Sequence, residues 1–93
     1  MYCQNLVFSR HAIQQMFFRR ITQQEVQQVI NSGEVIEENP NEPPFPSYLI
    51  LDFVNGQPIH VVFSYDEVSD TGYVVTAYIP DSNLWTDNFK KRR

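Results

Sequence analysis

The 93-residue sequence is poor in the features that mark several large classes of protein. Cysteine occurs once, at Cys3, which excludes a disulfide scaffold and a zinc cage built on several thiolates. No apolar run approaches the roughly 20 residues that a membrane-spanning helix needs. The three glycines, Gly33, Gly56 and Gly72, form none of the glycine-rich loops that cradle phosphates. The first residues, 1–4, contain neither the basic nor the apolar stretch of a signal peptide, so we expect a cytoplasmic protein without membrane contact.

The residues that are present suffice for one small domain. Seven Phe, five Tyr and one Trp supply apolar bulk, and 42% of the chain is hydrophobic. A disordered chain lacks that content. Because 93 residues are enough for one core and too few for two, we expect a single domain spanning residues 1–93.

Charge is distributed unevenly along the chain. The net charge is −4, yet all seven basic residues lie in two groups near the ends, at Arg10, Arg19 and Arg20 and at 90–93. Residues 21–89 contain no Lys or Arg, and all eleven acidic residues lie between Glu25 and Asp87. A fold that joins the two basic groups would create a local positive site on an acidic body. The alternative is that 90–93 is a solvated tail.

The first third of the chain has the periodicity of two helices. Ser9 is suited to cap a helix over 10–19, whose apolar residues recur on one face. The segment from Thr22 to Glu25 is a capping box that begins a second helix. Gly33 is expected to end that helix in a left-handed conformation.

The sequence pattern from residue 34 onward predicts mainly β-strands. Strands are predicted over 34–38, 48–54, 58–65 and 73–79, with a proline-rich loop at 39–47 and a type I′ hairpin turn at 55–56. The order predicts an α+β fold, in which two N-terminal helices pack on one face of an antiparallel sheet of about four strands.

Two histidines are the main candidates for chemistry. His60 alternates with the more apolar positions of its strand, so we expect it on the less densely packed face, where Ser64, Thr76 and Tyr78 would form a polar strip with it. The alternative is a half-exposed strand histidine without a role. His11 lies near a helix N-terminus, which favours an anion such as phosphate. The alternative interpretation of His11 is a capping or surface histidine without a functional role.

The residue types favour acid–base chemistry without a metal or cofactor. Two histidines and scattered carboxylates have no diagnostic ligand spacing, and Cys3 has no evident base. Cleavage of RNA by its own 2′-hydroxyl needs a base, an acid and a cation for the phosphate. Histidine, tyrosine and arginine can supply all three.

Several ordered motifs resemble one prokaryotic family. They are Ser9-Arg10-His11-Ala12, Met16 with Arg19, Ile21-Thr22, Glu25-Val26, Gly33-Glu34-Val35-Ile36, Pro58-Ile59-His60-Val61-Val62, Tyr65, Thr76-Ala77-Tyr78-Ile79-Pro80, Trp85 and Phe89-Lys90-Lys91-Arg92-Arg93. Across about residues 6–93 the chain resembles the domain of unknown function family DUF4258. That family often has glycine where this chain has Arg20. A residue with a Cβ is strained by about 1 kcal/mol in the left-handed conformation that glycine would adopt there, which favours an altered turn. The alternative is that Arg20 is an extra cation that contacts phosphate.

The resemblance implies a fold and a function. The family is regarded as similar to the RelE/ParE-like toxins of toxin–antitoxin pairs, and its members are often encoded beside a zinc-finger antitoxin of the kind that partners the MqsR toxin. We therefore expect a type II toxin that is a metal-independent endoribonuclease, with RNA as substrate and a protein antitoxin as partner. The sheet edge after the last strand would receive an antitoxin segment.

This reading gives each candidate residue a role. His11 and His60 would share acid–base catalysis, and Tyr78 would position a group or donate a proton. Arg10, Arg19 and Arg20 would contact phosphate. Trp85, Lys90 and Lys91 would stack on RNA or steer it, although Trp85 is equally suited to plug a core. Two alternatives stay open: a non-catalytic toxin-like interaction module, and a gyrase-directed toxin of the ParE type.

Overall fold

The two helices begin at the capping residues that the sequence identifies. The computed structural model describes residues 1–93, in which α1 spans Arg10–Arg19 and α2 spans Gln23–Ser32. The Ser9 hydroxyl accepts a hydrogen bond from the Ala12 N–H at 3.0 Å. The Thr22 hydroxyl accepts from the Glu25 N–H at 3.1 Å, and the Glu25 carboxylate accepts from the Thr22 N–H at 2.8 Å. Both predicted caps are therefore confirmed.

The two helix ends differ from the sequence predictions. Arg20 adopts the left-handed conformation that glycine would favour, with φ 58° and ψ 40°, so the turn is not altered. The prediction of a left-handed Gly33 is wrong, because its φ is −79° and its ψ 173°. A Cβ at Gly33 would collide with the carbonyl oxygens of Val29 and Leu51. Glycine is required there by close packing of α2 on the sheet, not by backbone handedness.

Relief of the strain at Arg20 should stabilise the protein. A left-handed residue with a Cβ costs about 1 kcal/mol, and the greater chain entropy of unfolded glycine offsets part of that gain. We expect Arg20→Gly to raise the free energy of unfolding by about 0.5 kcal/mol in urea titrations. The matched control is Gln14→Gly, exposed in the middle of α1, which should lower it by about 1 kcal/mol. Equal losses in both variants would contradict the prediction.

Five strands form one sheet. They are β1 (Asn5–Phe8), β2 (Glu34–Asn39), β3 (Ser47–Val54), β4 (Gln57–Asp66) and β5 (Thr71–Tyr78). β3 and β4 are joined by the predicted turn, in which Asn55 and Gly56 have φ values of 52° and 82°. Positive φ at both central residues is the requirement of a type I′ turn.

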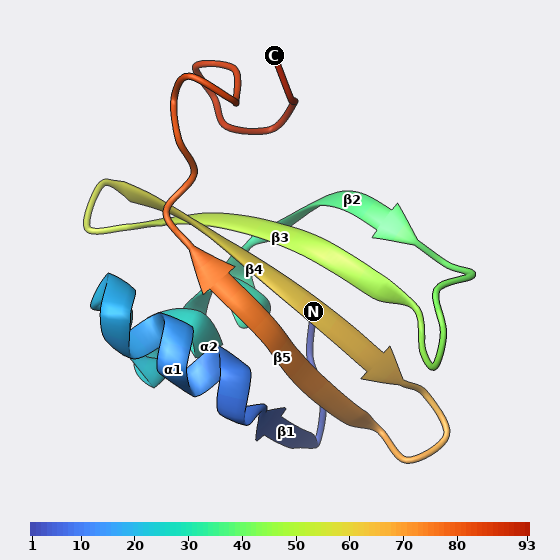
Figure 1. Ribbon diagram of the computed structural model, residues 1–93. Helices are drawn as coiled ribbons and strands as arrows, with labels where there is room; N and C mark the ends of the chain where they lie inside the picture. The colour runs from blue at the N-terminus through green and yellow to red at the C-terminus, as the bar shows by residue number, and fades with distance from the viewer.

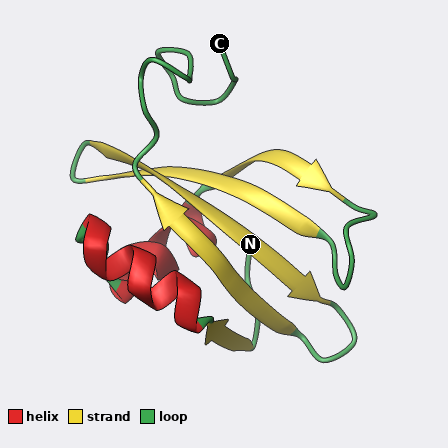
Figure 2. Cartoon of the chain, viewed as in Figure 1, coloured by secondary structure: helices red, strands yellow, loops and turns green.

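The sheet topology corrects two expectations. The strand order is β1-β5-β4-β3-β2, and β1 pairs with β5 in parallel. The sheet is thus five-stranded and mixed, where about four antiparallel strands were expected. The expected free edge after the last strand is only partial, because β1 covers β5 from Thr71 to Val74. Both helices lie on one face of the sheet, as predicted (Figures 1 and 2).

Each face of the sheet is buried by a different part of the chain. On the helix face, α1 and α2 pack on a cluster that includes Val61, Phe63 and Val74. On the other face Leu49, Leu51 and Trp85 are buried although they lie outside that cluster. There the C-terminal segment 80–93, called the tail below, leaves the end of β5 and folds back on itself (Figure 1). Neither helix has the length and apolar character needed to cross a membrane.

Candidate functional site

His60 lies on the face of the sheet that the tail covers. Its register partners are Leu51 on β3 and Tyr78 on β5. The Trp85 ring meets the His60 ring edge-on, with 4.5 Å between centroids. His60 is 0% exposed, so the alternative of a half-exposed histidine is wrong. The predicted face is correct, and the tail is what buries it.

Two hydrogen bonds fix the tautomer of His60. Its Nε2 lies 2.8 Å from the Phe89 carbonyl oxygen, and its Nδ1 lies 3.2 Å from the Tyr78 hydroxyl. A carbonyl only accepts, so Nε2 carries the proton. Burial lowers the pKa of His60 below its ordinary value, while the bond to Phe89 and the charge of Glu37 oppose that shift. The neutral ring therefore uses Nδ1 to accept the Tyr78 O–H.

Tyr78 is half-buried at the end of β5, beside two arginines. Burial is the main cause that raises the pKa of Tyr78 above its ordinary value. The charges of Arg92 and Arg19 lower it and that of Glu37 raises it. The phenol is thus protonated at neutral pH, with cations close enough to favour a negative charge if one develops.

Arg19 is held in place by the backbone of β5. Its Nη1 donates to the Ala77 carbonyl oxygen at 2.9 Å and to the Thr76 hydroxyl at 3.3 Å. The guanidinium forms none of the ion pairs of the chain. Its Nε and Nη2 make no hydrogen bond within the protein, and so remain for an external anion.

A cleft of about 400 Å³ joins these groups. It is lined by Arg19, Tyr78, Ile79, Asp81, Leu84 and Trp85. Three residues that the sequence nominated from separate segments, Arg19, Tyr78 and Trp85, therefore share one site. His60 lies behind it, in contact with both aromatic rings.

The structure does not bring the other N-terminal candidates into this cleft. Arg10 and His11 are exposed in the first turn of α1. His11 is eight residues from Arg19, or about 12 Å along the helix axis. His60 is buried on the opposite face of the sheet, so the two histidines do not share one centre. Arg20 follows α1 and is exposed at the turn into α2.

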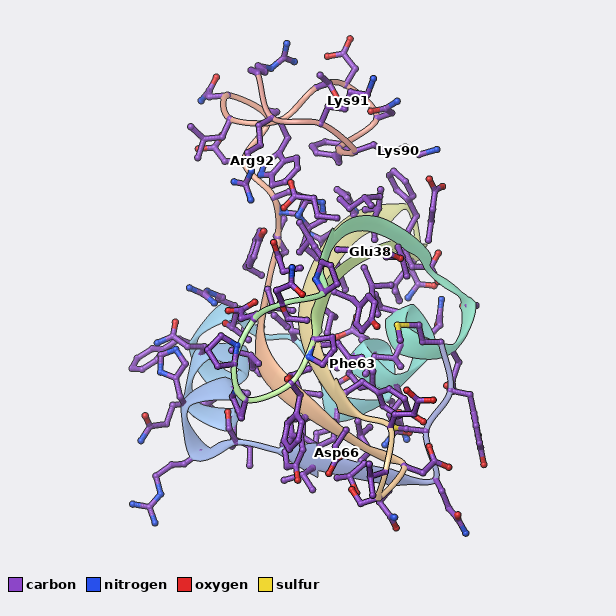
Figure 3. The ribbon with its side chains drawn as sticks, turned by 90° about the vertical axis from the view of Figure 1, so that its right-hand side faces the viewer. Glu38, Phe63, Asp66, Lys90, Lys91 and Arg92 are labelled. Carbon is purple, nitrogen blue, oxygen red and sulfur yellow. The ribbon has the colours of Figure 1, made fainter.

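Most tail cations are neutralised within the chain. Lys90 pairs with Glu34 at 3.0 Å, Arg92 with Glu37 at 3.2 Å, and Arg93 with Asp87 at 2.9 Å. Lys91 is exposed and forms no ion pair. Lys90, Lys91 and Arg92 gather at one end of the molecule, far from Asp66 at the other end (Figure 3). The tail is a folded loop, closed by the Arg93 N–H bond to the Leu84 carbonyl at 2.9 Å.

Sequence reasoning missed several parts of the cleft. Asp81 and Leu84 line it directly, and the Phe89 carbonyl fixes the His60 tautomer. Arg92 lies over the Trp85 ring, 4.6 Å from its centroid. Asp81 had one available signal, because it lies in the loop that follows β5, and loops carry many binding residues. The role of a backbone carbonyl had none.

The predicted polar strip is only partly assembled. His60 faces Tyr78, and Thr76 lies two residues along β5. A register shift follows between Val62 and Phe63, beyond which Ser64 pairs with Tyr73. No group of three or more His, Cys, Asp or Glu side chains is placed to hold a metal ion.

These features define a small α+β protein with two helices on one face of a mixed sheet and an arginine–tyrosine cleft at the sheet end. The chain belongs to the family described as domain of unknown function DUF4258, whose model matches residues 8–79. That range includes Arg19, His60 and Tyr78, and it ends before Trp85, Lys90 and Lys91. The chain matches no curated protein and no solved structure.

Proposed function

We propose that the protein is a metal-independent endoribonuclease and the toxin of a type II toxin–antitoxin pair, with its reactive centre in the Arg19–Tyr78 cleft. The observation that carries the proposal is the hydrogen bond from the Tyr78 hydroxyl to the neutral, buried His60, beside an arginine without a carboxylate partner. The family resemblance also favours it, because that family is regarded as similar to the RelE/ParE-like toxins.

Tyr78 and His60 together would act as the base. As the RNA 2′-hydroxyl attacks the adjacent phosphorus, its proton passes to the Tyr78 oxygen, and the Tyr78 proton passes to His60 Nδ1. The 2′-oxygen–phosphorus bond forms and the bond to the 5′-oxygen breaks. The departing 5′-oxygen takes a proton from water in the open cleft, which leaves a 2′,3′-cyclic phosphate and a 5′-hydroxyl. This role differs from the proton donation first expected of Tyr78, because its proton is directed at His60 rather than at the cleft.

Arg19 would stabilise the phosphate in the transition state. Its Nη1 is anchored to β5, so little side-chain entropy is lost when Nε and Nη2 bind phosphate oxygens. Charge that develops on the phosphate is best stabilised by a donor already in position. His60 touches no substrate in this scheme, and acts as a positioning and proton-relay residue. The partner of the whole protein would be a protein antitoxin, and the zinc-finger type is the first to test.

Expression in a bacterial host tests this proposal. We expect tightly induced wild type to arrest growth and to produce discrete new RNA ends with 5′-hydroxyls. Arg19→Gln should lose both effects by about 100-fold or more, the range for removal of one transition-state donor. His11→Ala, outside the cleft, should keep them. Intact RNA with folded wild-type protein, or full activity of Arg19→Gln, would refute the proposal.

A non-catalytic interaction module is the second candidate. Two almost fully exposed phenylalanines, Phe17 and Phe18, favour it. Under that reading, growth and RNA are unaffected by any of the cleft substitutions.

A further inference from the structure

α1 has an outward face that no other part of the chain covers. Phe17 is 82% exposed and Phe18 80% exposed, and their rings meet edge to face with 6.4 Å between centroids. Single exposed apolar residues are common on protein surfaces. Two adjacent phenylalanines with most of their area in water, beside the 45% exposed Ile13, form a continuous apolar patch.

A small hollow lies beside this patch. It measures about 170 Å³ and is lined by Ile13, Met16, Phe17, Ile21 and Gln23, where α1 turns into α2. Four of its five lining residues are hydrophobic. A hollow of this composition suits one inserted aliphatic or aromatic side chain, the arrangement that anchors protein–protein interfaces.

The chain segment that carries the patch is basic. No acidic residue occurs before Glu25, whereas Arg10 stands at the start of α1 and Arg20 follows its end. Neither arginine takes part in an ion pair. The whole chain has a net charge of −4, but α1 and the turn after it carry only positive charges. α1 lies at the margin of the fold beside β5, open to a large partner (Figure 1).

We propose that the Ile13–Phe17–Phe18 face of α1 docks an acidic amphipathic segment of a partner protein. One apolar side chain of that segment would fill the hollow, others would cover the two phenylalanines, and carboxylates would face Arg10 and Arg20. The proposal does not depend on RNA cleavage, because none of the patch residues lines the Arg19–Tyr78 cleft.

Other occupants fit the face less well. A twofold dimer through this face would set its arginines against their own copies, with no carboxylate between them. Successive bases of a single strand stack in parallel, whereas the two phenylalanine rings are inclined by 72°. Both occupants are therefore distinguished in the test.

The test is selection of random 16-residue peptides, displayed on phage, with the full-length wild-type protein as bait. We expect enriched peptides to be net acidic, with apolar residues three and four positions apart. Calorimetry with an enriched peptide should show affinity at least 10-fold weaker for the Phe17→Ala/Phe18→Ala double variant. Arg20→Gly, which suits the left-handed turn, should weaken it at least threefold. Val68→Ala, a control at a residue 98% exposed on the β4–β5 turn, should not change it.

Circular dichroism first establishes that each variant is folded. No enrichment, enrichment of basic peptides, or equal affinity for the double variant would overturn the proposal. Two further results would also overturn it. The first is a wild-type dimer, detected by sedimentation, that is lost in the double variant. The second is RNA binding that the double variant loses while its peptide affinity is unchanged. Growth arrest is scored separately, so failure here leaves the ribonuclease proposal standing, and the reverse also holds.

Discussion

Tyr78→Phe should slow RNA cleavage at least about 100-fold while leaving the fold intact. The substitution removes only the hydroxyl that links the cleft to His60 Nδ1, at 3.2 Å. A positioned base contributes about 10²–10⁴-fold to such reactions, so we expect a loss of at least about 100-fold. His60 loses one hydrogen-bond donor, which should lower the free energy of unfolding by only about 1 kcal/mol. The measurement is the single-turnover cleavage rate on an RNA oligonucleotide, beside a urea titration.

Tyr73→Phe is the matched control. Tyr73 belongs to the same strand, but its ring stacks on Phe45 with 5.8 Å between centroids, and it does not line the Arg19–Tyr78 cleft. It should cleave at the wild-type rate. Unchanged cleavage by Tyr78→Phe would remove Tyr78 from the mechanism and with it the relay to His60.

The wild-type rate should also depend on pH through His60. The relay needs a neutral ring, and burial lowers the pKa of His60 from 6.5. With its pKa lowered, the ring is mostly neutral at neutral pH, so cleavage should be constant there and fall as the solution becomes more acidic. A rate that rises toward acidic pH would instead require protonated His60 as the active form.

The local elements could be predicted because their signals are short in range. Ser9, the Thr22–Glu25 capping box and the Asn55-Gly56 turn each act within a few residues, and the structure has all three. β1 could not be predicted in this way, because only four residues form it and its partner β5 is more than 60 residues away. Glycine at position 33 was correctly taken as the end of α2, but a left-handed conformation was the wrong reason. The actual reason is its close packing against Leu51, a long-range contact that the local sequence does not reveal.

Prediction of the candidate site was limited in the same way, because sequence signals are local and the site is formed by contacts between distant residues. Residue chemistry together with the family resemblance selected Arg19, His60, Tyr78 and Trp85, which do lie together. It also selected His11, because a helix N-terminus is attractive for anions wherever the helix is placed. The neutralised tail cations could not be anticipated, since Glu34 and Glu37 lie more than 50 residues before Lys90 and Arg92. Ion pairs of that separation are determined by the topology alone.

Trp85→Ala should be the most destabilising single substitution in the tail. Trp85 is only 3% exposed, packs against His60, and has Arg92 over its ring at 4.6 Å. Truncation of a buried aromatic costs about 3–5 kcal/mol, a large fraction of the roughly 5–14 kcal/mol typical of a chain this long. Because it is the only tryptophan, unfolding of the variant must be followed by circular dichroism. Leu84→Ala, at a neighbour 64% exposed, should cost less than about 0.5 kcal/mol.

Trp85→Ala should also change the pKa of His60. Burial is the main cause of its lowered pKa, and Trp85 supplies part of that burial. Its removal admits water to the ring, so the pKa of His60 observed by NMR should rise toward 6.5. A variant with unchanged stability and an unchanged His60 pKa would mean that the Trp85 ring neither stabilises the fold nor keeps water from His60. The burial of His60 would then come from β3, β5 and the rest of the tail, which includes the Phe89 carbonyl.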